Sequence, residues 1–169
     1  SVPKEKRGKG LRITVSVSSF VPKPFTPFQW APQNTKDEII RKQHLLKDAL
    51  RGLRGVEYAY HAPDISVLEA VMARGDRRIA DVIEKAYYKG ARFDSWDEHF
   101  KLELWDEAFA EAKVDPAYYA NRERTLDEAL PWDHVDMLVT KDYLKREYHN
   151  ALNETCTRDC RKGCNGCFG

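Results

Sequence analysis

The sequence lacks the features that mark several common protein classes. It contains no apolar run near the roughly 20 residues that a membrane-spanning helix needs, so we expect no membrane contact. Its first residues do not show the basic stretch followed by an apolar one that is typical of a secretory signal. It also lacks an excess of either charge, because 28 Lys and Arg residues against 27 Asp and Glu residues give a net charge of +1. Binding to nucleic acid mainly through positive charge is therefore not indicated.

Motifs of several enzyme classes are also missing. No Gly-x-Gly-x-x-Gly, P-loop or Gly-x-Ser-x-Gly occurs, which leaves nucleotide hydrolysis and serine hydrolase chemistry without support. The chain does have 42% hydrophobic and 11% aromatic residues over 169 positions, enough for a buried core and too many for a disordered chain. Because the first residue is Ser1 and not Met, we expect the chain to be a piece of a longer protein.

Cysteine is absent from the first 155 residues and then occurs four times. A secreted domain with disulfides would spread its cysteines through the fold, so we expect reduced thiols and a cytoplasmic protein. The spacings are x3, x3 and x2, and Gly163 and Gly166 let the backbone wrap tightly between the thiols. This pattern suits an iron–sulfur cluster or a zinc ion, and it leaves open unliganded or disulfide-bonded cysteines. The predicted metal ligands are Cys156, Cys160, Cys164 and Cys167.

The amino-terminal third begins with a charged, glycine-containing segment over residues 1–10, which we predict to be a flexible lead-in whose basic side chains could contact phosphate. Over residues 11–20, Ile13, Val15 and Val17 alternate with hydroxyl residues, which predicts a strand. Its apolar face would pack on helices. Its Ser/Thr face suits solvent or the lumen of an enzyme barrel.

A proline-rich loop, a helix and a second strand come next. Four prolines and three aromatics over 21–34 predict an ordered, extended loop without helix, which follows the carboxyl end of a strand, where ligands bind in α/β folds. Thr35 and Glu38 form a capping box for a helix over 35–54, and alternation over 56–61 predicts the second strand. Because a helix connects the strands, we expect them to be parallel and the fold to be α/β.

Beyond residue 62 the pattern is almost entirely helical. Helices are predicted over 64–75 and 76–90, and a capping box at Ser95 and Glu98 predicts one from 95 to about 113. Asp115 with Pro116 begins a further helix, and Thr140 begins the last one. We therefore expect a lead-in, a β–loop–α–β unit, a helical extension and a cysteine-rich tail, with the bounds 1–10, 11–62, 63–153 and 154–169.

Asp133 and His134 lie in a polar stretch among aromatic residues, where they could contact substrate or belong to a buried turn network. A free-standing enzyme that uses these two residues is one hypothesis. The many Trp and Tyr side chains could form a platform for stacking bases, but at helical spacing they are more typical of a core. Nucleic acid is thus a weakly indicated partner.

Four stretches together resemble one family. Residues 18–30, SSFVPKPFTPFQW, are similar to the loop after a late strand of radical S-adenosylmethionine (SAM) barrels, especially in the cobalamin-binding group. Residues 90–100, GARFDSWDEHF, and 130–134, LPWDH, resemble the carboxyl-terminal half of an uncharacterised subfamily of these proteins, as does the cysteine run over 159–167. The resemblance covers most of residues 11–169.

The resemblance implies a parent iron–sulfur, oxidoreductase-like protein of unknown substrate, with a cobalamin-type domain and a SAM-cluster barrel ahead of this region. The barrel's core three-cysteine motif and most of its strands are absent here, so the chain alone is expected to perform no radical chemistry. Cys160, Cys164 and Cys167 do repeat the Cys-x3-Cys-x2-Cys spacing, but only two residues and no barrel follow them. SAM and cobalamin would bind only in the parent, whose remaining domains would be the partners of this region.

In the parent, this chain would supply the last barrel strands and a helical extension, and its tail would bind an auxiliary cluster or zinc. The resemblance implies that five residues line or cover the barrel mouth, namely Ser16, Ser18, Pro22, Lys23 and Thr26. The alternative is a non-catalytic helical interaction module whose zinc knuckle docks on RNA or on a protein. Arg158, Arg161 and Lys162 inside the cysteine run would suit that alternative.

Overall fold

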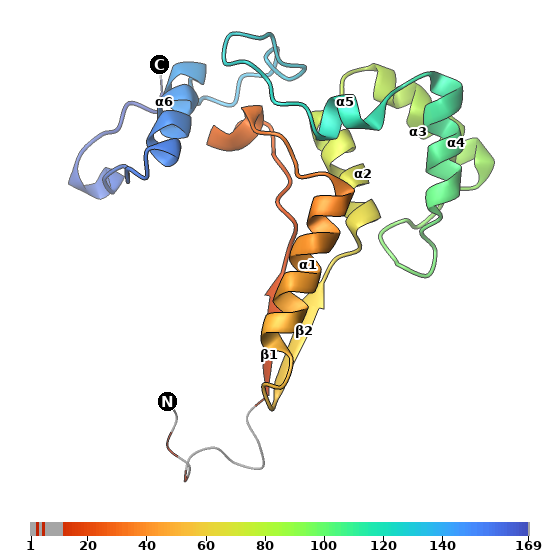
Figure 1. Cartoon of the computed structure of the whole chain (residues 1–169). Coiled ribbons are helices and arrows are strands. Elements are labelled where there is room, and N and C mark those ends of the chain that lie inside the picture. The colour runs from red at the N-terminus through yellow and green to blue at the C-terminus, as the bar shows by residue number, and fades with distance from the viewer. Residues whose placement is uncertain (1–2, 4, 6–11, 169) are drawn as a thin grey trace.

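The computed structural model describes residues 3, 5 and 12–168, so most of the predicted lead-in over 1–10 lies outside the described residues. Within them, six α-helices accompany one two-stranded sheet, and the predicted α/β class with a helical majority is confirmed. Figure 1 shows β1, β2 and α1 as an arm that extends from two helical lobes. No described helix combines the length and the apolar character that crossing a bilayer requires.

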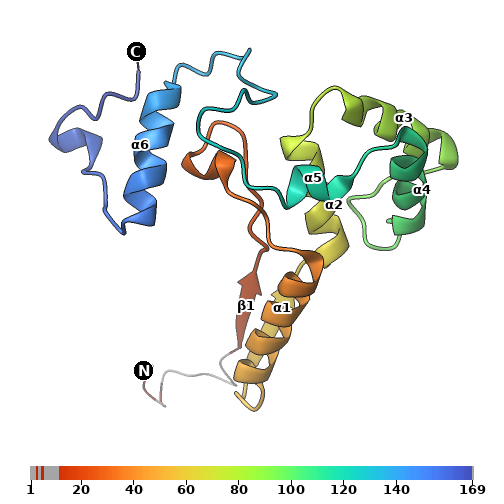
Figure 2. The same cartoon turned by 45° about the horizontal axis from the view of Figure 1, so that its top comes forward.

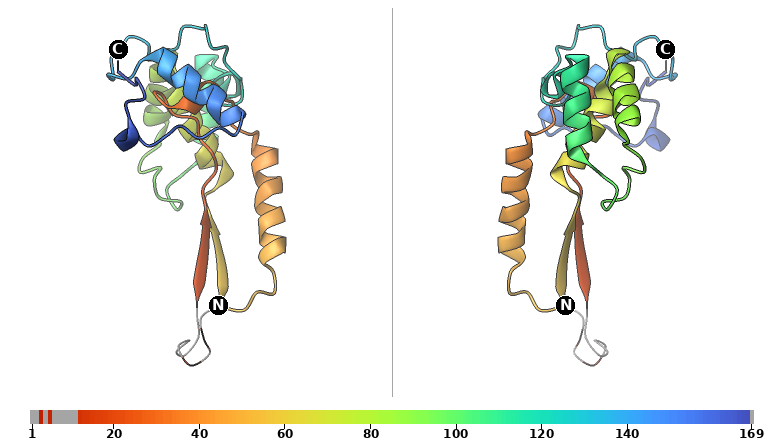
Figure 3. Two further views of the ribbon diagram at one scale, coloured as in Figure 1. Left: turned by 90° about the vertical axis from the view of Figure 1, so that its left-hand side faces the viewer. Right: turned by 90° about the vertical axis from the view of Figure 1, so that its right-hand side faces the viewer.

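The arm is a β–α–β unit. β1 (Ile13–Val17) and β2 (Val56–Tyr60) pair in parallel, as predicted, with Val15 opposite Tyr58. α1 (Lys36–Leu50) connects them and lies along one face of the pair, and Figure 3 shows no other element on the opposite face. The outer edges of both strands are also unpaired within the described residues. Parallel sheets are normally covered on both faces, whereas in this unit α1 covers only one.

The ends of α1 follow from its sequence. The Thr35 hydroxyl accepts a hydrogen bond from the Glu38 amide at 3.4 Å, which confirms the predicted cap. The helix ends at Leu50, before the predicted residue 54, because the chain turns through Gly52 at φ 88° and Gly55 at φ 77°. Residues with a Cβ atom rarely adopt these angles, so the glycines end the helix and start the return to β2.

The loop over 21–34 is ordered, as predicted, and it contains one helical turn. Pro27–Trp30 form the 3-10 helix η2, so the expectation that prolines exclude helix here was wrong for this turn. Pro27 occupies its first position, where a missing N–H costs no hydrogen bond. Trp30 is 0% exposed and anchors the loop to the protein interior.

The larger lobe consists of α2 (Pro63–Arg74), α3 (Arg78–Lys89), α4 (Leu102–Ala112) and α5 (Pro116–Ala120). The predicted Asp115 cap is confirmed, because its carboxylate accepts from the Ala117 amide at 2.9 Å. Alanine side chains lie among the large apolar ones in their shared core. The buried residues of this core include Ala70, Val71, Ile79, Val82, Ala86, Trp105, Ala108, Phe109 and Tyr119.

The predicted helix over 95–113 was wrong in its first third. α4 begins only at Leu102, and residues 93–100 form consecutive turns, in which the amides of Trp96 and His99 donate to carbonyls three residues earlier. Phe100 lies before α4 and packs against the larger core. Tertiary packing therefore overrides the Ser95–Glu98 capping pattern.

The smaller lobe joins the proline-rich loop to α6 (Lys141–Leu152), which begins at the predicted residue because the Thr140 hydroxyl accepts from the Tyr143 amide at 3.2 Å. Its core contains three aromatic residues from distant segments. The buried members are Trp30, Leu130, Trp132, Leu144 and Tyr148. The expectation that the Trp and Tyr side chains are core is confirmed for Trp105, Tyr119 and Trp132 and was wrong for others, which are exposed, namely Tyr87, Tyr88, Trp96 and Tyr118.

Asp76 links the start of α3 to α5 and makes stability sensitive to acid. Its carboxylate accepts from the Arg78 side chain and amide and from the Tyr119 hydroxyl at 3.0 Å. The Arg78 hydrogen bond is the main cause that lowers the pKa of Asp76 from 3.8 to about 2. Because the folded pKa is the lower one, this stabilisation is complete above pH 3.8 and is lost as the pH falls towards 2.

We therefore expect Asp76→Asn to lower the free energy of unfolding by about 1 kcal/mol at pH 7. The difference from the wild type should shrink between pH 4 and pH 2, measured by urea unfolding at several pH values. Asp81→Asn on the exposed face of α3 is the control, with a smaller loss at neutral pH. If the unfolding free energies of the wild type and Asp76→Asn differ by a constant amount down to pH 2, the ionised Asp76 carboxylate is not the source of the stabilisation.

Candidate metal centre and ligand-facing surfaces

All four cysteines of the tail are unpaired. Cys156, Cys160 and Cys164 are exposed, and Cys167 is half-buried. No disulfide joins them, so every thiol is available as a metal ligand. The tail itself is folded: Figure 2 shows it leaving the end of α6, turning at the 3-10 helix η3 (Cys160–Lys162), and returning towards the beginning of α6.

Hydrogen bonds attach the tail to α6 at both ends of the helix. Near the carboxyl end, the Thr155 amide donates to the Asn150 carbonyl at 2.8 Å. Near the amino end, the Thr140 amide donates to the Cys167 carbonyl at 3.0 Å, and the Arg146 guanidinium donates to the Asn165 carbonyl. The tail is therefore attached to α6 where it leaves and where it returns, and Figure 2 shows the part around η3 lying away from the helix.

Two glycines shape the segment between the thiols. Gly163 has a φ of 145° and Gly166 a φ of 65°, both in the region that favours glycine. A Cβ atom at Gly163 would lie 2.8 Å from the Arg158 guanidinium, so glycine lets this side chain pass close to the backbone. The Gly166 amide donates to the Cys164 sulfur at 3.3 Å, a contact that stabilises a thiolate.

The chemistry of this donor set fits a metal centre, because it offers four free thiols in one folded segment. Among residues 12–168, no three Cys, His, Asp or Glu side chains are grouped as metal ligands. Binding would therefore require the thiols to rotate inward, which is the usual coupling of metal binding to local folding. The prediction of four metal ligands stays a prediction.

Tyr143 on α6 lies beneath the returning tail. Burial raises its pKa, and negative charge on Glu147, Cys167 and Cys160 would act in the same direction. The Arg146 guanidinium stacks over the Tyr143 ring at 4.9 Å from its centroid. The side of α6 that faces the tail thus places the Tyr143 ring and the Arg146 guanidinium near Cys160 and Cys167.

The predicted Ser/Thr face of the first strand is the uncovered face of the sheet. Ser16 is exposed and alternates with Val15 and Val17, which are half-buried on the side of α1. Ser18 follows the carboxyl end of β1 and lines a hollow of about 220 Å³ between this end and α1. Carboxyl ends of parallel strands are the places where α/β proteins bind ligands.

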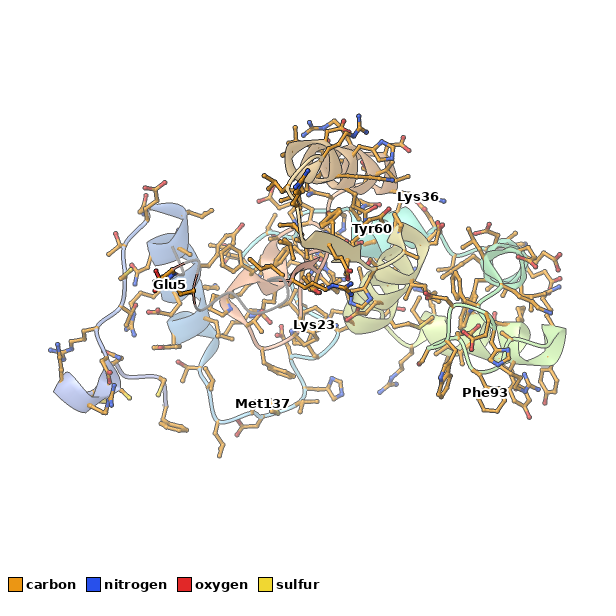
Figure 4. The ribbon with its side chains drawn as sticks, turned by 90° about the horizontal axis from the view of Figure 1, so that it is seen from below. Glu5, Lys23, Lys36, Tyr60, Phe93 and Met137 are labelled. Atoms are coloured by element: carbon orange, nitrogen blue, oxygen red, sulfur yellow. The ribbon has the colours of Figure 1, made fainter. Side chains whose placement is uncertain are left out.

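The three candidates in the proline-rich loop have different surroundings. Pro22 is fully buried, so its ring packs inside the protein. Lys23 is exposed and forms an ion pair with Glu69 of α2, while the Thr26 hydroxyl donates to the Lys23 carbonyl at 2.8 Å. Figure 4 shows Lys23 and Tyr60, at the end of β2, in the central region between the lobes. The structure therefore joins Lys23 and Thr26 by a hydrogen bond, and it buries the neighbouring Pro22.

Asp133 and His134 line an open hollow of about 430 Å³ with Phe25 and Met137, whose side chain is labelled in Figure 4. The Asp133 carboxylate already accepts from the Leu130 amide at 2.9 Å and from the Lys141 ammonium at 2.7 Å. Within the described residues no hydrogen bond joins Asp133 to the imidazole of His134. This pair therefore lacks the orienting contact of an acid–base couple, and the structural role of Asp133 accounts for its position.

Two residues of the hollow beside β1 were missed from the sequence. The Tyr58 hydroxyl is buried without a hydrogen-bond partner among the described residues. Gln43 is buried on α1 and donates to the His61 carbonyl at 3.0 Å. The burial of Gln43 could have been found from the sequence, because this polar residue lies four positions after Ile39 on the apolar face of a predicted helix. Nothing in the sequence distinguishes Tyr58 from other aromatic strand residues.

Comparison with known proteins gave no match: no family model fits this chain, no curated protein is similar to it, and no solved structure resembles it.

Proposed function

We propose that the chain is the carboxyl-terminal part of a radical SAM iron–sulfur protein and that its tail binds an auxiliary iron–sulfur cluster. The observation that carries the metal-binding proposal is the folded tail, in which four thiols are free and hydrogen bonds to α6 fix both ends. An iron–sulfur cluster, when bound, transfers single electrons. This chain's contribution is to supply the thiolates and to hold them against α6.

The uncovered face and the unpaired edges of the sheet support the proposal that this chain supplies the last strands of a barrel. In the strand pair, α1 covers the apolar face, while the face with Ser16 and the outer edge of each strand are open. A barrel strand pair requires helices outside and parallel neighbours at both edges, and a face of hydroxyl residues would suit the lumen of an enzyme barrel. The remaining domains of the parent are the partners that would cover these surfaces, and SAM and cobalamin would bind there.

The parent can be tested directly. The coding sequence upstream of Ser1 is expected to encode a Cys-x3-Cys-x2-Cys motif within a run of alternating strands and helices. An upstream sequence that encodes no such motif would remove the radical SAM proposal, and the metal-binding proposal for the tail would still stand.

A zinc knuckle in a helical interaction module is the second candidate. Cys164 and Cys167 have the x2 spacing that zinc sites favour, and the Gly166 amide already donates to the Cys164 sulfur. This candidate would leave the chain without redox chemistry. Zinc and iron can be told apart by metal analysis.

We expect about four iron and four sulfide ions per chain after purification without oxygen, with a brown chromophore. The measurement is iron, sulfide and zinc content together with a visible spectrum. The variant in which serine replaces all four cysteines is the matched control and should bind none of them. One zinc ion per chain without iron would favour the knuckle, and a wild-type chain that binds neither metal would contradict a metal centre in this tail.

A further inference from the structure

Four large aromatic side chains are exposed where α3 ends and in the turns that follow it. Tyr87 and Tyr88 are 53% and 79% exposed, and Phe93 and Trp96 are 69% and 55% exposed. Together they form a surface that we call the aromatic patch, and Figure 4 labels Phe93 on the larger lobe. Single exposed apolar side chains are common on proteins, whereas several of them together mark an interaction surface.

Ring contacts and backbone turns hold the aromatic patch in place. The rings of Tyr87 and Tyr88 lie 5.6 Å apart between centroids, and those of Phe93 and Trp96 lie 6.0 Å apart. The amides of Trp96 and His99 each donate to the carbonyl three residues earlier, and residues at this spacing share one side of a turn. The His99 ring accordingly lies 6.0 Å from that of Phe93. The exposed rings are therefore positioned in advance of any binding.

Arg92 shows which chemical group these rings accept. Its guanidinium lies 3.4 Å from the centroid of the Tyr87 ring and donates to the Ala91 carbonyl at 2.6 Å. A planar guanidinium stacks well on aromatic faces, which explains this contact. Within the described residues no cation lies over Tyr88, Phe93 or Trp96. Three rings of the patch are thus free for a cation from outside the chain.

The turns that carry Phe93 and Trp96 are negatively charged. Over residues 93–101 the sequence has three carboxylates, Asp94, Asp97 and Glu98, and one basic residue, Lys101. None of the three carboxylates forms an ion pair among residues that the structure describes, and Asp94 Oδ1 is buried without a donor. Charge complementarity therefore favours a cationic partner and disfavours nucleic acid or an anionic lipid surface.

We propose that the aromatic patch binds an arginine-containing segment of another protein. The guanidinium groups of this segment would stack on the free rings as Arg92 stacks on Tyr87, and they would donate to the carboxylates of the turns. Arginine and aromatic side chains supply much of the binding energy at protein interfaces. The inference is independent of the metal-binding tail and of the radical SAM parent.

Two synthetic peptides test the inference on the whole chain. One alternates arginine with serine, and in the other lysine replaces arginine, so that both carry the same charge. The anisotropy of a fluorescent label on each peptide gives the affinity. We expect the arginine peptide to bind at least about threefold more tightly, because lysine lacks the planar group that stacks on a ring. It should also protect Trp96 from quenching by acrylamide, since Trp30, Trp105 and Trp132 are buried.

Variants locate the binding surface. Tyr88→Ala combined with Phe93→Ala should weaken binding of the arginine peptide at least about threefold, and Trp96 remains as a reporter. Neutralising Asp94, Asp97 and Glu98 together as amides should weaken it at low salt, with a difference that shrinks at high salt. Leu45→Ala on α1 is the control, because Leu45 is 59% exposed and lies outside the patch. Circular dichroism checks that each variant is folded.

Several results would overturn the inference. These are an arginine peptide that does not bind, a lysine peptide that binds as tightly, and a double variant at Tyr88 and Phe93 that binds like the wild type. Phosphatidylcholine vesicles provide a further probe. A blue shift of Trp96 emission with these vesicles, without protection by the arginine peptide, would replace the protein partner by a membrane surface.

Discussion

Arg74→Met is expected to lower the free energy of unfolding by about 3–5 kcal/mol, because it removes a buried charge that holds three backbone carbonyls in place. Arg74 is 0% exposed at the end of α2. Its guanidinium donates to the carbonyls of Tyr119 and Ala120 at 2.7 Å and to that of Arg122 at 2.8 Å. Methionine retains the apolar part of the side chain but leaves the buried Tyr119 carbonyl without a donor, whereas the Ala120 carbonyl keeps the Gln33 amide at 2.9 Å.

The position of Arg74 also explains why a cation is tolerated in the interior. Burial lowers the pKa of Arg74 to about 10, which still leaves the side chain charged at neutral pH. Two of its acceptors, Tyr119 and Ala120, are the last residues of the short helix α5, whose carbonyl end carries partial negative charge. Arg124 continues the network, since its guanidinium donates to the Arg74 carbonyl at 2.7 Å.

Urea unfolding followed by tryptophan fluorescence measures the effect. Arg74→Lys should recover part of the loss, because an ammonium keeps the charge but cannot reach all three carbonyls with the fixed geometry of a guanidinium. Arg51→Met is the exposed control, and its expected change is below about 0.5 kcal/mol because it forms a surface ion pair with Asp48. A change of less than about 1 kcal/mol for Arg74→Met would mean that its hydrogen bonds do not hold this junction.

The local parts of the fold could be predicted from the sequence. The alternation around Val15 and the capping residues Thr35, Asp115 and Thr140 produced elements at or near the expected positions. These signals act over a few residues, so the chain alone contains them. Parallel pairing also followed, because a helical connection leaves little alternative.

Contacts between distant segments could not be predicted. Arg74 looks like an ordinary basic residue in the last turn of a helix, and its partners come more than 40 residues later. The turns over 93–100 have the same cause, since Phe100 packs into a core that the local capping pattern does not include. Local pattern competes with tertiary packing, and packing prevails where a large apolar side chain can be buried.

The candidate site divides in the same way. The cysteine spacing is local and was visible at once, but the attachment of the tail to α6 depends on bonds between residues that no local pattern links. The hydrogen bond from the Lys141 ammonium to the Asp133 carboxylate likewise depends on the position of α6. Residue types therefore indicated the chemistry, while three-dimensional contacts decided which of the candidates are free to perform it.

Trp30→Ala is expected to lower the free energy of unfolding by about 3–5 kcal/mol through the cavity that it leaves. Trp30 is 0% exposed in the core of the smaller lobe, and its ring lies 5.8 Å from that of Tyr148 on α6. Its carbonyl accepts from the Arg124 amide at 2.9 Å, which links this core to the Arg74 network. Urea unfolding measures the loss, and Trp96→Ala is the matched control, since Trp96 is 55% exposed and should cost below about 1 kcal/mol.

The helices that lose hydrogen-exchange protection in Trp30→Ala show whether Trp30 stabilises only the smaller lobe or the whole chain. Hydrogen exchange of Trp30→Ala should show lost protection in α6, whereas α3 and α4, which pack on the other core, should retain it. The bonds that fold the tail onto α6, from Thr140 to Cys167 and from Arg146 to Asn165, do not involve Trp30. Metal content of Trp30→Ala should therefore equal that of the wild type even though the lobe is loosened. Loss of metal together with loss of protection would instead mean that metal binding by the tail depends on the packing of α6 against the proline-rich loop. The stability of that packing and the metal affinity of the tail would then be coupled.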